Sequence, residues 1–588
     1  MRTYRAPIDE LAFTLEAVGE LSKVMALPGF EPLDNELVLA ILTQAGQFSE
    51  EQVAPTNFAA DRQGSRVEDR RVVTAPALDG VYQAYREGGW PSLTGDPAFG
   101  GQGLPHTLGF AVEEIVQSAN LSFSLMPLLT QGVVTALSRY GSVEQKDFIL
   151  PKLVSGEWAG TMNLTEPQAG SDLGLVKARA ERDGEHYRLF GQKIFITWGD
   201  QSYTDNIIHL VLARTPDAPP GVKGISLFIV PKFLVAADGT IGERNDVYPI
   251  GVEDKLGIHA SPTCTMAYGD NGGAIGYLVG EENQGLKYMF AMMNHARLAV
   301  GLQGVAVAER ARQHALSYAR ERLQGSVAGE GTVAIVRHPD VRRMLLTMEA
   351  LVQGGRALAL RTMHHFDHAL HAAEPEQRTL HQQRVDLLTP LVKGWCTEIA
   401  NEVTSLGVQV HGGMGFVEET GAAQYYRDAR ILAIYEGTNG IQALDLVGRK
   451  LLANRGEYAT ALLADLEGVV AASREAGLTA LADKLGAALQ LCAQAVRDVL
   501  MRAEAEPDRP AVVAFNLLML LGTATAGGYL MMGANRAAEL LAAGGGDGEL
   551  YRRKIALARV YIEQILPRCH AYSEAVLAGA EGVMAVDP

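Results

Sequence analysis

Cysteine is scarce in this chain, with four residues among 588 and no CxxC pair. The four lie far apart in the sequence, at Cys264, Cys396, Cys492 and Cys569. Such spacing offers neither a disulfide framework nor the paired thiolates of a zinc site, and we predict no metal site. The N-terminal residues lack the apolar run of a secretory signal, so both absences favour a cytoplasmic location.

Basic residues are outnumbered by acidic ones, with 51 Lys and Arg against 68 Asp and Glu, which gives a net charge of −17. Binding to a phosphate backbone needs a concentrated basic surface, so we expect no nucleic-acid partner. An anionic small molecule is still compatible with this composition, because a few local Arg or Lys side chains can outweigh the global charge.

One segment lacks charge altogether, PAVVAFNLLMLLGTATAGGYLMMGAN at residues 510–535. Its length could span a bilayer. However, it contains Asn516, Thr523, Thr525 and a pair of glycines, and its flanks are ordinary amphipathic helix. We therefore predict a helix buried in a bundle or a subunit interface, and membrane-surface association is the less favoured alternative.

Hydrophobic periodicity divides the chain into helical and strand-rich parts. Apolar residues recur at three- and four-residue spacing in 36–55 and 105–142, which predicts helices. Short apolar or β-branched runs bounded by Gly, Pro, Asp and Asn follow, from about 160 to 280. No helices alternate with these runs, so we predict an antiparallel β-domain rather than a doubly wound sheet.

Helical patterns return after about residue 285 and continue along the rest of the chain. We predict a long helix over 285–323 with a break near its middle, a loop over 326–340, and two long helices over about 340–410. AEPDRP (505–510) and GGGDG (544–548) interrupt the helical tail. The predicted segments are an N-terminal extension (1–35), a helical domain (36–158), a β-domain (159–282), a helical bundle (283–450) and an additional helical domain (451–588).

Three short motifs combine glycine with polar or aromatic residues. TEPQAGSDLG (165–174) suits a loop whose backbone approaches a ligand closely. KIFIT (193–197) places Phe195 and Thr197 on one face of a strand, although a strand Phe usually belongs to the core. QVHGGMGF (409–416) follows a helix, so it is not the strand-first fingerprint of a dinucleotide-binding fold, and the sequence has no Walker A lysine motif.

A single carboxylate, Glu436, interrupts the largely apolar stretch ILAIYEGTNGIQ at residues 431–442. A buried carboxylate is costly unless it is partnered or its pKa is raised. The alternative is that Glu436 merely favours the positive end of the helix that follows. This stretch alone leaves both interpretations open.

The order of seven motifs resembles that of the acyl-CoA dehydrogenase family. The motifs are TEPQAGSD, KIFIT, EDKLGIHASPTC (253–264), ENQGLKYMF (282–290), a helix bearing Arg297, QVHGGMGF and YEGTNGIQ, and the resemblance covers roughly residues 40–450. It implies an α+β multidomain fold, with a helical N-terminal domain, an antiparallel β middle domain and a four-helix-bundle C-terminal domain. It also implies FAD, held by the β-domain, the bundle and a neighbouring subunit.

The resemblance assigns roles to individual positions. For the cofactor it implies contacts from Met162, Leu164, Thr165, Ser171, Phe195, Thr197 and Thr438, and contacts to the partner subunit's FAD from Arg322, Gln409, Gly412 and Gly413. For the acyl-CoA substrate it implies contacts from Ser171, Asn294, Arg297 and Gly437. For Arg297 the alternative is an exposed helix charge.

Three departures from the family pattern fall at positions tied to the adenine and pyrophosphate contacts rather than to the flavin ring. The stretch after the long helix reads RERLQGSV, which keeps Arg322 and loses the family's Phe-Gly part. The usual His-Gln pair is His338-Pro339, and Gly440 stands where the family has Gln.

The implied reaction removes a proton from Cα and a hydride from Cβ of an acyl-CoA thioester. A base at Cα needs a raised pKa, which burial supplies. By motif that base is Glu436. Some family members carry the base just before the arginine matched by Arg297, but Ala296 stands there and cannot abstract a proton.

Residues 4–21 and the tail beyond the bundle resemble an extended bacterial branch, which includes enzymes acting on 3-(methylthio)propanoyl-CoA and on fatty acyl-CoAs. The resemblance implies an electron-transfer flavoprotein as acceptor and a homodimer or a dimer of dimers. Two alternatives are an acyl-CoA oxidase that uses oxygen and a non-catalytic protein that binds CoA esters.

Overall fold

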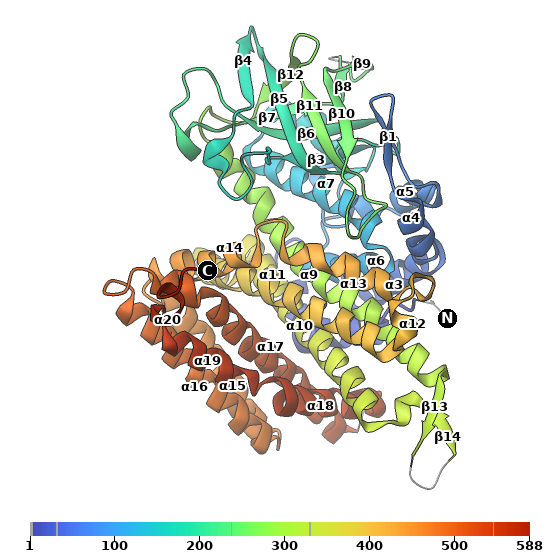
Figure 1. The fold of residues 1–588 in the computed structure, drawn as a ribbon, viewed down its shortest axis with the longest axis vertical. Helices are drawn as coiled ribbons and strands as arrows, with labels where there is room; N and C mark the ends of the chain where they lie inside the picture. Colours follow the sequence, from blue (N-terminus) through green and yellow to red (C-terminus); the bar gives the residue numbers. More distant parts are fainter. Residues whose placement is uncertain (1–3, 31–32, 237, 328–330, 545) are drawn as a thin grey trace. The chain divides into compact units, whose positions relative to one another are not determined.

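The computed structural model describes residues 4–30, 33–236, 238–327, 331–544 and 546–588. The chain forms two compact units that are discontinuous in sequence. Unit 1 comprises Met1–Gln47, Pro105–Ser118 and Arg297–Pro588, and unit 2 comprises Phe48–Leu104 and Ala119–Ala296. Figure 1 labels the helices and strands of both units.

Unit 2 is built around an eight-stranded sheet with the strand order β10-β11-β5-β12-β7-β6-β3, in which β4 also pairs with β5. Its strands are β3 (Trp158–Asn163), β4 (Arg179–Asp183), β5 (His186–Thr197), β6 (Asn206–Ala213), β7 (Ser226–Pro231), β10 (Val247–Val252), β11 (Thr263–Tyr268) and β12 (Ala274–Leu278). Two small antiparallel ladders pair β1 (Arg66–Glu68) with β2 (Arg71–Val73) and β8 (Phe233–Val235) with β9 (Ile241–Arg244).

The prediction of a wholly antiparallel β-domain is wrong at one edge of this sheet. Strand β3 runs parallel to β6, from Trp158 opposite Asn206 to Asn163 opposite Val211. The other ladders of the sheet are antiparallel. The loop at 165–174 and the hairpin of β4 and β5 intervene between β3 and β6, so the chain returns in its original direction.

Unit 2 also contains the helices α4 (Asn57–Gln63), α5 (Val81–Glu87), α7 (Leu121–Tyr140), α8 (Val143–Val154) and the first part of α9 (Gly285–Glu321). Of these, α7 and α8 pack against strand β3 of the sheet. Helix α7 lies against β3 so closely that a Cβ at Gly160 would lie 2.6 Å from a methyl carbon of Val133. The indole Nε1 of Trp198 donates to the Ser122 carbonyl at 3.0 Å, which fastens the end of β5 to the same helix.

Unit 1 is helical and contains the bundle that the sequence predicts. The bundle region consists of α6 (His106–Ala119), the rest of α9, α10 (Pro339–His371), α11 (Pro375–His411), α12 (Gly413–Phe416), α13 (Ala422–Arg430) and α14 (Asn439–Val447). Helices α10 and α11 run side by side (Figure 1). Together with the β-domain and the helical N-terminal segments, this architecture confirms the predicted α+β multidomain fold.

The predicted break in the middle of the long helix is wrong, because α9 is continuous from Gly285 to Glu321. Its central glycines serve packing instead. A Cβ at Gly301 would lie 2.6 Å from the carbonyl oxygen of Val392, and one at Gly304 would lie 2.4 Å from that of Cys396. Without side chains at these two positions, α9 can approach the backbone of α11.

The predicted loop at 326–340 contains structure. Strands β13 (Leu323–Ser326) and β14 (Thr332–Ala334) form an antiparallel hairpin, a 3-10 turn follows at Ile335–Arg337, and α10 starts at Pro339. Residues 328–330 of that prediction lie outside the described residues. Gly325 disfavours a strand, whereas Thr332 and Val333 favour one, so pairing with β14 rather than the local propensity of β13 makes this hairpin.

The tail adds a helical region to unit 1, as predicted. Its helices are α15 (Glu457–Glu475), α16 (Thr479–Arg502), α17 (Arg509–Ala543), α18 (Gly548–Val560), α19 (Arg568–Ala578) and α20 (Glu581–Met584). The N-terminal helices α1 (Ile8–Ala17), α2 (Leu21–Met25) and α3 (Asn35–Phe48) precede the bundle in sequence, and α1 packs on α10 and α17. The Glu10 carboxylate pairs with Lys554 of α18.

Within the described part of the chain, two helices are long and apolar enough to cross a membrane by length and composition, α7 and α17 (Arg509–Ala543). The most apolar windows of these helices are 72% and 78% buried inside the fold. Small residues let α17 pack closely, since a Cβ at Gly522 would lie 2.6 Å from the Trp395 ring of α11. The uncharged segment is therefore a buried helix of the tail region, as predicted.

Candidate active site

Glu436 lies in a tight turn between a 3-10 turn at Ile431–Ala433 and helix α14. Its backbone is left-handed, with φ of 56°, and the following Gly437 has φ of 86°. A non-glycine residue in this region costs on the order of 1–3 kcal/mol and persists where the surroundings hold it. Gln442 supplies part of that support, because its Nε2 donates to the carbonyls of Glu436 and Gly437 at 3.3 and 3.4 Å.

The left-handed backbone favours glycine at position 437, and a side chain there would also crowd Gln442. A Cβ there would lie 2.7 Å from the Gln442 Nε2 and 3.8 Å from Nη2 of Arg297. Thr438 then caps the helix, since its Oγ1 accepts the backbone N–H of Ile441 at 3.2 Å. Helix α14 thus begins directly after the turn that carries Glu436, where the sequence predicted a helix start.

A buried lysine, which the sequence analysis missed, joins this turn to α11. The side chain of Lys393 is fully buried, and its Nζ donates to Oδ1 of Asn439 at 2.9 Å. The Asn439 amide in turn donates to Thr397 Oγ1 at 2.9 Å and to Glu398 Oε1 at 2.7 Å. A charged residue inside the apolar run LLTPLVKGWC (387–396) was the available signal, of the same kind that singled out Glu436.

Arg297 approaches the turn from α9. It is 5% exposed, which rules out the exposed-charge alternative, and its Nη1 lies 3.9 Å from Oδ2 of Asp445 on α14. The close approach of α9 and α11 at Gly301 and Gly304 brings these two helices to the same region of the bundle. Arg297 and Lys393 therefore place two cationic side chains in the electrostatic surroundings of Glu436.

The surroundings shift the pKa values of Glu436 and Lys393 towards 7. Burial raises the pKa of the Glu436 carboxyl to about 7, although the positive charges of Arg297 and Lys393 oppose the shift. Burial likewise lowers the pKa of Lys393 to about 7, against the opposing effect of Glu436. A carboxylate with such a pKa can accept a proton near neutral pH, where an ordinary glutamate is too weak a base.

In unit 2 the loop at 165–174 is fastened to β5 by a buried ion pair. Lys193 Nζ lies 2.8 Å from Glu166 Oε1, and both side chains are buried. Glu166 also accepts the backbone N–H groups of Lys177 and Ala178, and the N–H of Ile194 donates to the Thr165 carbonyl at 2.9 Å. As part of the polar motif TEPQAGSDLG, Glu166 carried no sign of this structural role, which only the fold reveals.

Phe195 lies at an irregularity in β5. The ladder with β11 shifts register so that Cys264 faces Ile196 while Met266 faces Lys193. Phe195 has φ of 59° and is 58% exposed, although Lys193, two residues before it, is fully buried. This bulge interrupts the alternation from which the sequence analysis inferred a common face for Phe195 and Thr197, and it turns an aromatic ring outward.

The other predicted cofactor residues of unit 2 lie on β3, in the loop at 165–174 and the residues before it, and at the end of β5. Met162, Thr165 and Thr197 are partly exposed, Ser171 is exposed and Leu164 is buried. A Cβ at Gly170 would meet nothing within 4 Å. An exposed aromatic side chain, hydroxyl groups and an open glycine fit a flat aromatic cofactor such as the FAD that the resemblance implies.

The remaining predicted positions are mostly at the surface of their units. Asn294 is exposed on α9, Arg322 is exposed just after α9, and Gln409, Gly412 and Gly413 are exposed at the end of α11. Beside that last group, Met414 is 48% and Phe416 is 87% exposed. Thr438 is exposed and borders a cavity of about 710 Å³, which is also lined by Tyr426, Arg430, Ile434, Gly440 and Phe515.

Four protein-family descriptions match consecutive parts of the chain. "Acyl-CoA dehydrogenase, N-terminal domain" matches residues 36–157, the middle domain of the same family matches 161–270 and its C-terminal domain matches 283–452. "Acetyl-CoA dehydrogenase C-terminal like" matches 462–587.

Individual proteins are similar over the whole chain. The 3-methylmercaptopropionyl-CoA dehydrogenase of Ruegeria pomeroyi is 48% identical over 97% of each chain. The broad-specificity linear acyl-CoA dehydrogenase FadE5 of Mycobacterium tuberculosis is 33% identical over 100% of this chain and 99% of its own. Among solved structures, an acyl-CoA dehydrogenase complexed with FAD from Bacillus anthracis has a TM-score of 0.75 at 22% identity and covers 96% of this chain and 91% of its own.

Proposed function

The chain belongs to the acyl-CoA dehydrogenase family of FAD-dependent oxidoreductases, and from that premise we propose that it converts a short acyl-CoA thioester into the trans-2-enoyl-CoA with Glu436 as the catalytic base. The observation that carries the assignment is the Glu436 carboxyl, whose pKa is raised to about 7 in a left-handed turn. Because family membership makes the chain an enzyme, the non-catalytic alternative is wrong.

In this proposal Glu436 takes the α-proton, and Arg297, Lys393 and desolvation set how readily its carboxylate gains or loses a proton. The carboxylate becomes neutral as it accepts the proton, so desolvation that penalises its charged form favours the transfer. Arg297 and Lys393 keep enough of the carboxylate ionised to act near neutral pH. When bound, FAD supplies the acceptor for the hydride that leaves Cβ.

The substrate carbonyl needs hydrogen bonds that strengthen as negative charge develops on its oxygen. We assign one of them to the backbone N–H of Glu436. Gly437 has no side chain to obstruct the approach of a thioester to this backbone. The flavin contacts are assigned to Met162, Leu164, Thr165, Ser171, Phe195, Thr197 and Thr438, and those to a partner subunit's FAD to Arg322, Gln409, Gly412 and Gly413.

The similarity to the Ruegeria pomeroyi enzyme favours 3-methylmercaptopropionyl-CoA as the substrate, because that relative matches 97% of each chain. We assign Ser171, Asn294, Arg297 and Gly437 to its binding. The same proposal includes an electron-transfer flavoprotein as the electron acceptor. It also includes a homodimeric or higher assembly and a cytoplasmic location. The exposed Phe416 and Met414 beside Gly412 and Gly413 support a subunit contact.

Anaerobic titration with a panel of acyl-CoAs tests the substrate assignment. We expect 3-methylmercaptopropionyl-CoA and butyryl-CoA, which have short chains of similar length, to bleach the flavin absorbance, with at least tenfold faster reduction by the thioether. Palmitoyl-CoA and the non-oxidisable 3-thia analogue of the short chain are the long-chain and unreactive controls. Fastest reduction by palmitoyl-CoA would contradict a short-chain substrate.

Reoxidation of the reduced enzyme distinguishes a dehydrogenase from an oxidase. We expect slow reoxidation by dissolved oxygen and fast reoxidation once an electron-transfer flavoprotein is added, followed by stopped-flow absorbance. Fast turnover on oxygen alone would favour the oxidase.

The buried lysine offers a test of the electrostatic part of the proposal. Replacing Lys393 by methionine removes a positive charge that lowers the Glu436 pKa, while Arg297 and Glu398 remain nearby. We expect the lower pKa in the pH profile of kcat/KM to rise by about one unit, the low end of the effect of one opposing charge. At pH 6 activity should therefore fall more than at pH 8.

The conservative Lys393→Arg keeps the charge and should shift this pKa less. Lys484→Met, an exposed position on α16, is the matched control and should leave the profile unchanged. A uniform loss of activity at all pH values would assign Lys393 a purely structural role.

A further inference from the structure

Four histidines gather where α10 and α11 pack together. His364, His365 and His368 lie on α10, and His381 faces them from α11. Their rings are in contact, with centroids 4.2 Å apart for His364 and His368, 4.6 Å for His368 and His381, and 5.0 Å for His365 and His381. None of these side chains has a part in the proposed dehydrogenation.

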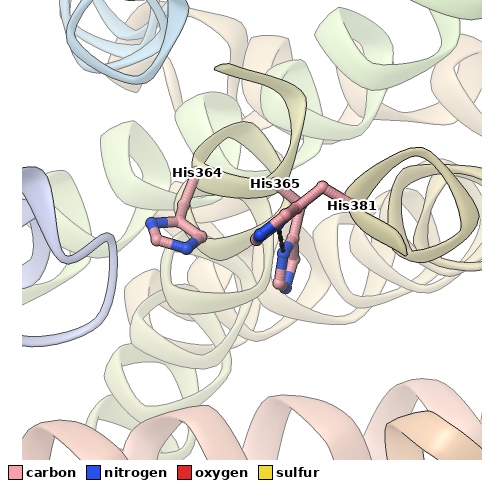
Figure 2. Close-up of side chains that lie close together, drawn as sticks. All are labelled: His364, His365 and His381. Atoms are coloured by element: carbon pink, nitrogen blue, oxygen red, sulfur yellow. Dashed lines mark hydrogen bonds between the residues drawn. The ribbon is translucent and has the colours of Figure 1, made fainter. Parts of the chain in front are cut away.

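Three of these side chains present ring nitrogens to one another. Figure 2 shows His364 and His365 on one helix and His381 reaching them from the neighbouring helix. Nδ1 of His365 lies 2.8 Å from Nδ1 of His381, and one ligand nitrogen from each of the three rings lies within 4.8 Å of the others. His364 and His365 are buried and His381 is half-buried.

The ring of His364 is oriented by the N-terminal segment. Its Nδ1 donates to the carbonyl of Gly19 at 2.9 Å, which leaves the lone pair on Nε2. Metal-binding histidines commonly have this arrangement, in which one ring nitrogen donates to a carbonyl and the other binds the ion. Oε2 of Glu20 lies 3.6 Å from the same Nε2, so a carboxylate borders the ring of His364.

The surroundings of His364, His365 and His381 disfavour the protonated form of each ring, and the neutral form is the one that binds metal ions. Burial and the charge of Arg361 lower the pKa values of His364 and His365 far below the ordinary histidine value. For His381 burial lowers the pKa to about 4. Neutral imidazole is a preferred ligand of zinc, copper and nickel ions.

The nearby arginines are paired with carboxylates, which limits their repulsion of a cation. Arg361 Nη1 lies 2.6 Å from Glu20 Oε2, and Arg384 Nη2 lies 2.8 Å from Asp465 Oδ2. His365 and Asp465 both line a cavity of about 360 Å³ between the bundle and the tail helices. An ion could reach the ring nitrogens through this cavity.

We propose that His364 Nε2, His365 Nδ1 and His381 Nδ1 bind a divalent transition-metal ion, with Zn²⁺ as the reference ion and the fourth position open to water. Zinc–nitrogen distances of about 2.0–2.1 Å require ligand nitrogens roughly 3.4 Å apart in a tetrahedral site. The rings must therefore adjust, with His364 moving closer and the other two slightly apart. The hydrogen shared by the two Nδ1 atoms moves to Nε2 of the same ring, so both lone pairs become available.

Such an ion would link α10, α11 and the N-terminal segment. The cysteine spacing alone led to the prediction of no metal site, and three of the four histidines lie in one short helical stretch, MHHFDH (363–368). The fourth ring and the carbonyl of Gly19 join them only in the folded bundle. None of the three ligands is assigned to the proton transfer. We therefore expect the ion to stabilise the folded protein rather than to take part in the reaction.

Equilibrium dialysis of the full-length, FAD-loaded protein tests the site. After removal of bound metals with a chelator, we expect one Zn²⁺ per chain with a micromolar dissociation constant, and a higher melting temperature with Zn²⁺ than with Mg²⁺, which prefers oxygen ligands. Replacing the half-buried His381 by glutamine should weaken Zn²⁺ binding at least tenfold and abolish the rise in melting temperature. His570→Gln, an exposed position on α19, is the matched control.

Co²⁺ provides a measurement on the unaltered protein, which does not depend on how well a variant folds. We expect intense visible absorption bands of a four-coordinate Co²⁺ ion that Zn²⁺ displaces. A Zn²⁺ affinity unchanged in His381→Gln, or Co²⁺ spectra like those of the free aqueous ion, would overturn the proposal.

Discussion

Replacing Glu436 by glutamine is expected to slow flavin reduction by about 10³- to 10⁴-fold, the upper part of the range for loss of a general base. Glutamine has nearly the same size and can occupy the same turn, but its amide cannot accept the α-proton. Acyl-CoA binding and FAD content should change by no more than a few-fold. Anaerobic stopped-flow measurement of flavin bleaching, with ligand binding measured separately, checks this split.

A neighbouring carboxylate supplies the control. Glu398 on α11 accepts a hydrogen bond from Asn439, and Glu398→Gln keeps an oxygen at that position while removing the charge. We expect this variant to retain flavin reduction within about tenfold. If Glu436→Gln reduced its flavin as fast as the unaltered enzyme, Glu436 could not be the base, whereas the metal-binding proposal would stand unchanged.

Replacing Arg356 by methionine is expected to lower the free energy of unfolding by about 3–5 kcal/mol, the usual cost of removing one partner of a buried ion pair. Arg356 is fully buried on α10, and its Nε lies 2.8 Å from Glu114 Oε1 while its Nη2 lies 3.3 Å from Glu309 Oε2. Methionine fills part of the space but leaves two buried carboxylates with less compensation. Thermal and urea unfolding of the FAD-loaded protein measure the loss.

The pH dependence of the unfolding free energy gives a second check on the ion pair between Arg356 and Glu309. Arg312 and Arg356 outweigh the effect of burial and hold the pKa of Glu309 at about 2, below its ordinary value. A lowered pKa contributes stability above the unfolded value, and that contribution is lost as the pH falls towards 2. The difference between Arg356→Met and the unaltered protein should therefore narrow below about pH 4.5.

Arg343 on the same helix is the matched control. It pairs with Asp340 at 2.8 Å, but both side chains are exposed. Exposed pairs of this kind are worth about 0–1 kcal/mol. Arg343→Met should thus change the unfolding free energy by less than about 1 kcal/mol, and equal effects of the two substitutions would contradict the role assigned to burial.

Several features could be predicted from the sequence because local physics governs them. Apolar spacing predicted the helices on both sides of the strand-rich middle, and glycine and polar runs marked the loop at 165–174 and the turn at Gly412. A helix was expected to follow Glu436, and α14 begins at Asn439 with Thr438 as its capping residue. The predictions failed where contacts between two distant segments determine the structure. Examples are the parallel pairing of β3 with β6 and the continuous path of α9 past Gly301 and Gly304.

By itself, then, the sequence determined the order of helical and strand-rich parts, the family and the unusual carboxylate at Glu436, since each rests on residues close together or on the order of motifs. Only the tertiary structure decided which charges surround that carboxylate. Arg297 and Lys393 stand 139 and 43 residues before Glu436 in the chain, and the close packing of α9 on α11 brings them to it. The same holds for His381 and Gly19 beside His364, because contacts between distant residues are set by how helices pack and carry no local pattern.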